Sequence, residues 1–172
     1  MRHSPLLILS VCVAAPAVAE VKSATPSGFD IESKAVVSAD PAETYAALAR
    51  VGEWWNSEHT YSGDAANMTL EAKAGGCFCE AIPEGGGTIE HGRVIYARPG
   101  QALRVQGGLG PLQSEAVVGT LTWSLKPVDG GTEVTQSYVV GGYVRGGADK
   151  FAPIVDQVLG QQLAGLVRHL DD

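Results

Sequence analysis

The chain has little positive charge and no internal repeat, and each lack excludes a class of protein. Its 12 basic residues are outnumbered by 19 acidic ones in 172 residues, giving a formal charge of −7. A chain with this balance is not expected to bind nucleic acid or an anionic membrane surface. Its 22 glycines follow no fixed period, which excludes a collagen-like repeat, and no period of solenoid or propeller length is present.

The motifs of two large enzyme classes are also missing. No G-x-S-x-G sequence occurs, so the chain lacks the nucleophile elbow of the serine hydrolases. The glycine-rich stretches 84–87 and 107–110 lack the Lys-Ser/Thr ending of a phosphate-binding loop. Apolar residues nevertheless make up 45% of the chain and charged residues 18%, a composition typical of a folded globular protein.

Residues 1–19 predict a secretory signal peptide. A basic residue precedes the apolar stretch 6–15, and Ala17 and Ala19 form a small-x-small cleavage site. The apolar stretch is shorter than the ~20 residues that span a bilayer, and no second stretch approaches that length. We therefore expect cleavage after Ala19 and a periplasmic or secreted product without stable membrane insertion.

The mature chain predicts a short tether over 20–28 and a single domain over 29–172. Alternation of apolar and polar residues predicts a first strand over 29–38, and Asp40 followed by Pro41 predicts the capped start of a helix. Further alternating stretches, separated by glycine-rich turns, predict about six strands in a meander. They are 67–73, 77–82, 88–97, 102–106, 116–126 and 132–140.

Apolar residues at helical spacing predict a long last helix over 148–170, with Leu159 and Leu166 buried against the sheet. Gln162 falls near the centre of the apolar arc, where a polar side chain needs a partner. The predicted fold is therefore α+β, a curved antiparallel sheet that grips the long C-terminal helix and leaves a cavity between them.

The order of these motifs resembles the SRPBCC superfamily, the START/Bet v1-like helix-grip proteins. Within it, the chain is similar to the polyketide-cyclase-like and Hsp90-ATPase-activator-like branch. The matching motifs are 40–45, 54–55, 59–63, 75–80, 91–94, 107–113 and 130–132. The resemblance implies a cavity between sheet and helix that holds lipids, polyketides or other hydrophobic molecules. Because the chain carries an export signal, we do not expect an Hsp90 role.

Two interior histidines, His59 and His91, are candidate general bases, because histidine titrates near neutral pH. In the simplest register of the hairpin, Ile82 pairs with Thr88. Glu80 then neighbours another carboxylate, Glu90, and such a pair can divide the acid and base roles when burial separates the two pKa values. The favoured alternative places both carboxylates on a solvated face.

The same register sets Cys79 opposite His91, so that Cys77, Cys79 and His91 share one face. A soft metal, a disulfide, or two plain strand cysteines beside a hydrogen-bonded histidine all fit this arrangement. A disulfide would need a local kink, because residues two apart on a strand are widely spaced. We expect no metal and no cofactor.

The predicted function is binding of a small hydrophobic or aromatic ligand between the sheet and the last helix. The alternative is a cyclase, dehydratase or hydrolase that uses His59 or His91 as its general base in the same cavity. The predicted ligand contacts are aromatic residues with a polar edge, a loop leucine and polar anchors. They are Trp55, Tyr61, Leu109, Gln136, Tyr138 and Gln162.

Overall fold

The computed structural model describes residues 18–171, so most of the predicted signal peptide lies outside the described residues. Within them, eight strands form one antiparallel sheet in the order β1-β2-β8-β7-β6-β5-β4-β3. The strands are β1 (Val18–Thr25), β2 (Gly28–Val37), β3 (Met68–Leu70), β4 (Cys77–Ala81), β5 (Thr88–Arg98), β6 (Ala102–Gln106), β7 (Ala116–Val128) and β8 (Gly131–Tyr143). The α-helices are α1 (Pro41–Ala49) and α2 (Ala152–Asp171). The predicted fold class is confirmed.

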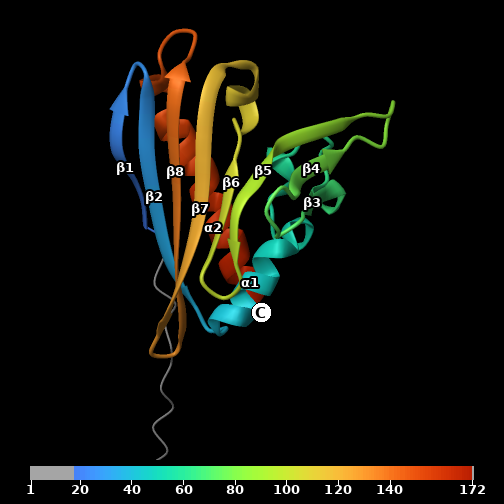
Figure 1. Ribbon diagram of the computed structural model, residues 1–172, viewed down its shortest axis with the longest axis vertical. Helices are drawn as coiled ribbons and strands as arrows, with labels where there is room; N and C mark the ends of the chain where they lie inside the picture. Colours follow the sequence, from blue (N-terminus) through green and yellow to red (C-terminus); the bar gives the residue numbers. More distant parts are fainter. Residues whose placement is uncertain (1–17, 172) are drawn as a thin grey trace, which may run out of the picture.

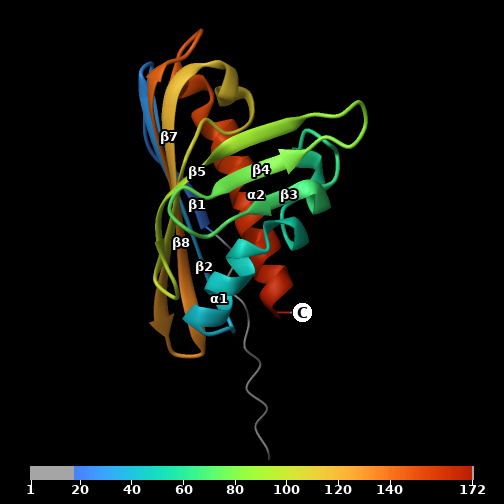
Figure 2. The ribbon, with the colours of Figure 1, turned by 45° about the vertical axis from the view of Figure 1, so that its right-hand side comes forward.

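The long helix α2 runs along one face of the sheet, and α1 lies near its C-terminal end (Figures 1 and 2). The hairpin of β4 and β5 projects away from the long strands. Strands β3 to β8 follow one another in the sheet as the predicted meander. Strand β2 pairs with β8, and β1 lies outside β2 at the edge of the open sheet. The sheet and helix therefore form two layers with the core between them.

The segment 20–28, predicted as a tether, is instead largely strand. Strand β1 pairs with β2 from Val18 opposite Lys34 to Thr25 opposite Gly28, with a bulge between Val21 and Ser23. The sequence of 20–28 gives little sign of this, because its apolar residues Val21 and Ala24 do not alternate with polar ones at the period of a strand. An edge strand can form without that pattern through hydrogen bonds to its neighbour.

Helix α1 begins as its sequence predicts. The side chain of Asp40 accepts hydrogen bonds from the main-chain N–H groups of Ala42 and Glu43, both at 2.8 Å, with Pro41 at the first position of the helix. These bonds satisfy donors that a helix start leaves free. The helix ends at Ala49, and short 3-10 turns then lead into the loop that carries Trp54 and Trp55.

Helix α2 packs closely on that loop as well as on the sheet. Leu159 and Leu166 are buried, as predicted. A Cβ on Gly165 would lie 2.4 Å from the carbonyl oxygen of Trp54, so only glycine allows this approach. None of the helices in residues 18–171 is long and apolar enough to cross a membrane.

Candidate functional site

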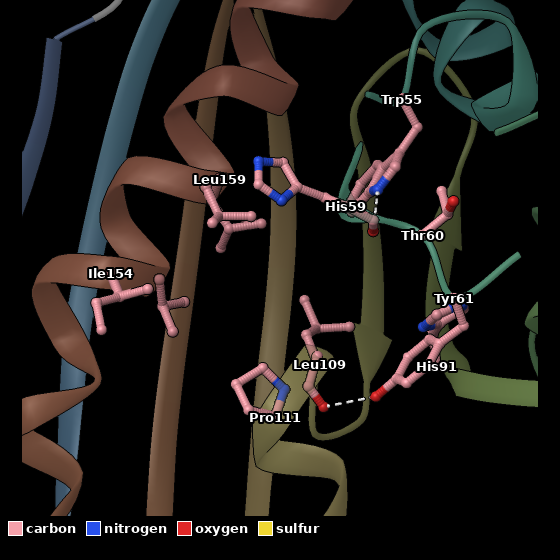
Figure 3. A pocket seen from close by; sticks show the side chains of 12 residues that line it. Trp55, His59, Thr60, Tyr61, His91, Leu109, Pro111, Ile154 and Leu159 are labelled. Carbon is pink, nitrogen blue, oxygen red and sulfur yellow. Dashed lines mark hydrogen bonds between the residues drawn. The ribbon is translucent and has the colours of Figure 1, made fainter. Parts of the chain in front are cut away.

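A cavity of about 410 Å³ lies between α2 and two loops, 55–61 and 109–111 (Figure 3). One wall comes from the first half of α2, whose Ile154, Val155, Val158 and Leu159 face it. The loop after β6 contributes Leu109, Gly110 and Pro111. Almost all of this lining is aliphatic, so a ligand here would be held mainly by removal of apolar surface from water.

The opposite wall is the loop that follows Trp54, and it carries most of the polar atoms. Trp55, His59, Thr60 and Tyr61 all line the cavity. The indole N–H of Trp55 donates to the carbonyl of His59 at 3.3 Å, and the hydroxyl of Tyr61 donates to the carbonyl of Gly110 at 3.0 Å. Figure 3 shows both bonds. The second joins the two loops that line the cavity.

Two candidate general bases, His59 and His91, both line the cavity. His59 points toward α2 in Figure 3, and its Nε2 lies 2.6 Å from Oε1 of Gln161 on that helix. This contact is exposed, so water competes with it. His91 is buried, with 6% of its surface exposed, and its position depends on an irregularity in β5.

That irregularity is a β-bulge at His91. Phe78 pairs with Gly92 as the predicted register requires, but Cys79 then pairs with Glu90. His91 is therefore the extra residue on β5, and it is buried together with its neighbour Gly92. The predicted pairing of Cys79 with His91 is wrong, because a bulge shifts the register by one residue and re-aims the side chains beyond it.

The bulge brings His91 next to Glu80. In the shifted register Glu80 pairs with Ile89 and is only 1% exposed, so its predicted place beside Glu90 on a solvated face is wrong. Its Oε2 lies 2.9 Å from Nε2 of His91, and its Oε1 accepts a hydrogen bond from the N–H of Ser62. Both residues are candidates from the sequence alone, but their pairing is not predicted there.

The protonation states of the pair follow from its surroundings. Burial opposes the charge of Glu80, but hydrogen bonds from Ser62, the main chain of Tyr61 and His91 outweigh it and hold the pKa of Glu80 below its usual value. Burial lowers the pKa of His91, although hydrogen bonding and attraction to Glu80 act in the opposite direction. At neutral pH we therefore expect a carboxylate and a neutral imidazole, which donates its Nε2–H to Glu80.

Aromatic rings surround His91. The ring centre of Tyr61 lies 5.9 Å from that of His91, and the ring centre of Phe78 lies 5.1 Å away. Phe78 in turn contacts Trp55 edge-on, with ring centres 5.5 Å apart. Trp55, Tyr61 and His91 line the cavity, so Phe78 supports its wall from behind.

Of the predicted ligand contacts, Trp55, Tyr61 and Leu109 line the cavity, whereas the three polar candidates do not. Gln162 is fully buried, and its Oε1 accepts from the N–H of Asn56 at 2.7 Å. The amide thus meets the main chain of the loop, and its N–H donates to the carbonyl of Val158 at 3.2 Å. The prediction that Gln162 anchors a ligand is therefore replaced by a structural role: Gln162 links α2 to the loop that carries Trp55 and His59.

Gln136 and Tyr138 are likewise used within the core. The amide of Gln136 accepts from the indole N–H of Trp123 at 2.9 Å and donates to the carbonyl of Leu159 at 2.8 Å. The hydroxyl of Tyr138 donates to the carbonyl of Gly107 at 2.8 Å and accepts from the N–H of Leu109 at 3.0 Å. These bonds fix α2 and the cavity loop to the sheet without facing the cavity.

The metal candidates Cys77, Cys79 and His91 do not form one site. The two cysteines are joined by a disulfide, with their Cα atoms 5.4 Å apart. His91 has turned to the buried face, and it is Glu90 whose carboxylate lies within 4.8 Å of both sulfur atoms. The kink that a disulfide requires is present as the register shift between Phe78 and Cys79.

Several lining residues were missed by the sequence analysis, namely Thr60, Gly110, Pro111, Ile154, Val155 and Val158. Ile154 offered a signal in the sequence, because it adds a large apolar residue to the start of the last helix, and in the structure it remains 60% exposed. When the apolar face of a helix is wider than its contact with the sheet, the remaining apolar residues can line a cavity.

No protein-family model matches the chain, and no curated protein matches it, but solved structures do. An uncharacterized protein from Rhizobium leguminosarum is 16% identical with a TM-score of 0.60, covering 91% of this chain and 98% of its own. CalU16 from Micromonospora echinospora is 12% identical with a TM-score of 0.58, covering 90% and 84%. The di-domain ARO/CYC StfQ from the steffimycin biosynthetic pathway is 12% identical with a TM-score of 0.59, covering 84% and 51%. These likenesses show that the chain has the helix-grip fold.

Proposed function

We propose that this protein is an exported binding protein for a small hydrophobic or aromatic ligand, held between α2 and the loops 55–61 and 109–111. The observation that carries the proposal is the cavity of about 410 Å³ with a largely aliphatic and aromatic lining. Its volume falls in the range of about 300–1,000 Å³ that small-molecule sites occupy. Two of the structural neighbours, CalU16 and the ARO/CYC StfQ, lend support at the level of fold.

The cavity also favours a particular polarity in its ligand. Main-chain groups already use the hydroxyl of Tyr61 and the indole N–H of Trp55. With the Nε2–H of His91 directed to Glu80, the other ring nitrogen is an acceptor. An apolar ligand with one hydroxyl or amine donor would satisfy it.

The binding proposal is tested by filling the cavity. Val158→Trp should place an indole in the ligand's space and weaken uptake of the neutral fluorophore N-phenyl-1-naphthylamine by at least about tenfold, the equivalent of 1.4 kcal/mol. Gln157→Trp is the matched control, because Gln157 neighbours Val158 on α2 but is exposed and outside the lining. Equal affinities for the two variants would contradict the proposed site. Native mass spectrometry of protein purified from the periplasm would identify the retained ligand and test export.

A second candidate function, a cyclase, dehydratase or hydrolase with His91 as general base, is favoured by the Glu80–His91 pair. A carboxylate that orients a neutral imidazole at a cavity wall is an arrangement that general bases use. The test compares small molecules extracted from the wild-type protein and from His91→Gln. If the protein only binds its ligand, the same compound should be extracted from both. If it is an enzyme, the wild-type extract should contain product or no compound, and the His91→Gln extract should contain the unconverted substrate, whose mass differs from that of the product.

A further inference from the structure

The Cys77–Cys79 disulfide coincides with the bulge that places His91. The Cα atoms of the two cysteines are 5.4 Å apart, whereas two steps along an extended strand cover about 6.6 Å. The bridge therefore shortens β4 at the point where β5 carries its extra residue, between the pairs Phe78–Gly92 and Cys79–Glu90. A shortened strand opposite a bulged one is a matched pair of irregularities.

The residue between the two cysteines belongs to the support of the cavity. Phe78 is fully buried, and its ring contacts those of His91 and Trp55, which both line the cavity. The cysteines themselves lie on the opposite face of β4 and are partly exposed. A reagent in solution can thus reach the disulfide on one face of the hairpin, while Phe78 on the other face transmits the change to the cavity wall.

We propose that Cys77–Cys79 is a redox-switchable disulfide that sets the ligand affinity of the cavity. In the oxidised state it holds β4 in the shortened form that fits the bulge, with His91 beside Glu80 and Phe78 behind Trp55. Reduction allows β4 to extend, so that the bulge is no longer matched and the wall formed by these rings loosens. This inference rests on the proposed binding function.

The switching reaction is thiol–disulfide exchange with an external thiol, from a small molecule or a protein dithiol. A thiolate attacks one of the two sulfur atoms, the bond between Cys77 and Cys79 breaks, and the departing sulfur takes up a proton. A second external thiolate then attacks the external sulfur of the mixed disulfide, and the remaining cysteine leaves as a thiolate that takes up a proton. In total, one protein disulfide and two external thiols become two cysteine thiols and one external disulfide, with two electrons passing to the protein.

The experiment measures the oxidised protein and the protein reduced with dithiothreitol by two independent readouts. The first is the affinity for N-phenyl-1-naphthylamine, which should fall by at least about fivefold, the lower end of the usual coupling between two sites. The second is the NMR signal of the His91 ring, assigned with His91→Gln, which should shift on reduction. Cys77→Ser/Cys79→Ser is the control: it should behave as the reduced protein and not respond to dithiothreitol.

Failure of the switch and failure of the binding proposal give different results. Probe binding that is equal in both redox states, with an unshifted His91 signal, overturns the switch and leaves the binding function standing. If the oxidised protein does not take up the probe, the binding function fails, and the His91 signal still decides whether the disulfide controls the wall. Loss of cooperative unfolding in the reduced protein would overturn the switch, because the bridge would then only hold the fold together.

Discussion

Inside the edge strand β1, the two halves of the sheet, β2, β8 and β7 against β6, β5 and β4, differ in regularity, and the difference separates packing from function. Strands β2, β8 and β7 pair without a break, from Gly28 opposite Gly141 to Val37 opposite Thr132 and from Ala116 opposite Tyr143 to Val128 opposite Gly131. Pairing in β4, β5 and β6 is shifted twice, at Phe78/Cys79 and at Val94/Tyr96. The regular half presents alternating side chains to the core, whereas the shifted half contributes His91 to the lining of the cavity.

Buried polar groups follow the same division. In the regular half, Gln136 and Tyr138 each make two hydrogen bonds within the protein. In the shifted half, the ring of His91 has one hydrogen-bond partner among residues 18–171, and this partner is Glu80. Satisfied groups specify a core, while a ring nitrogen at a cavity wall is a group that a ligand can use.

The largest expected effect comes from the helix α2 that covers the sheet. Leu166→Ala should lower the free energy of unfolding by about 2–5 kcal/mol, because it removes a fully buried side chain from the interface of α2 with the core. Urea unfolding measures the change. Ile154→Ala on the same helix is the control, since Ile154 is 60% exposed and should change stability by less than about 0.5 kcal/mol. Equal losses for the two variants would mean that α2 does not grip the sheet.

The next effect tests the bulge. Gly107→Ala should destabilise the protein by about 1–3 kcal/mol and weaken probe binding, because its Cβ would lie 2.0 Å from the carbonyl oxygen of His91. Gly141→Ala is the matched substitution in the regular half, where no heavy atom lies within 4 Å of the added Cβ. It should leave both stability and binding nearly unchanged. A harmless Gly107→Ala would show that the bulge does not need this close approach.

A smaller effect is expected at the link between α2 and the cavity loop. Gln162→Leu removes the acceptor for the N–H of Asn56 and should destabilise the protein by about 1 kcal/mol, the usual net contribution of one hydrogen bond. Probe affinity should fall only modestly, because Gln162 does not line the cavity. Fluorescence titration and urea unfolding measure the two quantities. Strong loss of binding with unchanged stability would restore the role of Gln162 as a ligand anchor.

The smallest effect is a pH dependence confined to the shifted half. Because burial lowers the pKa of His91, the unfolded chain binds a proton more readily than the folded one as the pH falls below about 6.5, the pKa of a free histidine. The contribution of neutral His91 to the free energy of unfolding should therefore be fully present above that pH. It should decrease as the pH falls toward the pKa of His91 in the folded protein. Glu80 adds a further loss at lower pH, since its folded pKa is also lowered. Unfolding of His91→Gln between pH 5 and 8 should lack the first decrease, and a retained decrease would assign it elsewhere.

Some features of the protein followed from local sequence alone. Asp40 and Pro41 predicted the start of α1, since capping depends on neighbouring residues. Alternation and helical spacing likewise predicted β2, β6, β7, β8 and the buried face of α2, because each pattern reflects one side facing one core. The cavity lining was partly predicted through Trp55, Tyr61 and Leu109, which combine apolar bulk with a place in a loop.

What only the tertiary structure decided is the pairing of elements across space. The edge strand β1, the bulge at His91 and the meeting of Glu80 with His91 all depend on register. A shift of one residue exchanges the two faces of a strand without changing any local pattern. The use of Gln162 depends in the same way on which main chain α2 meets. Sequence periodicity thus determined which residues form the core, and long-range packing determined which polar groups reach the cavity.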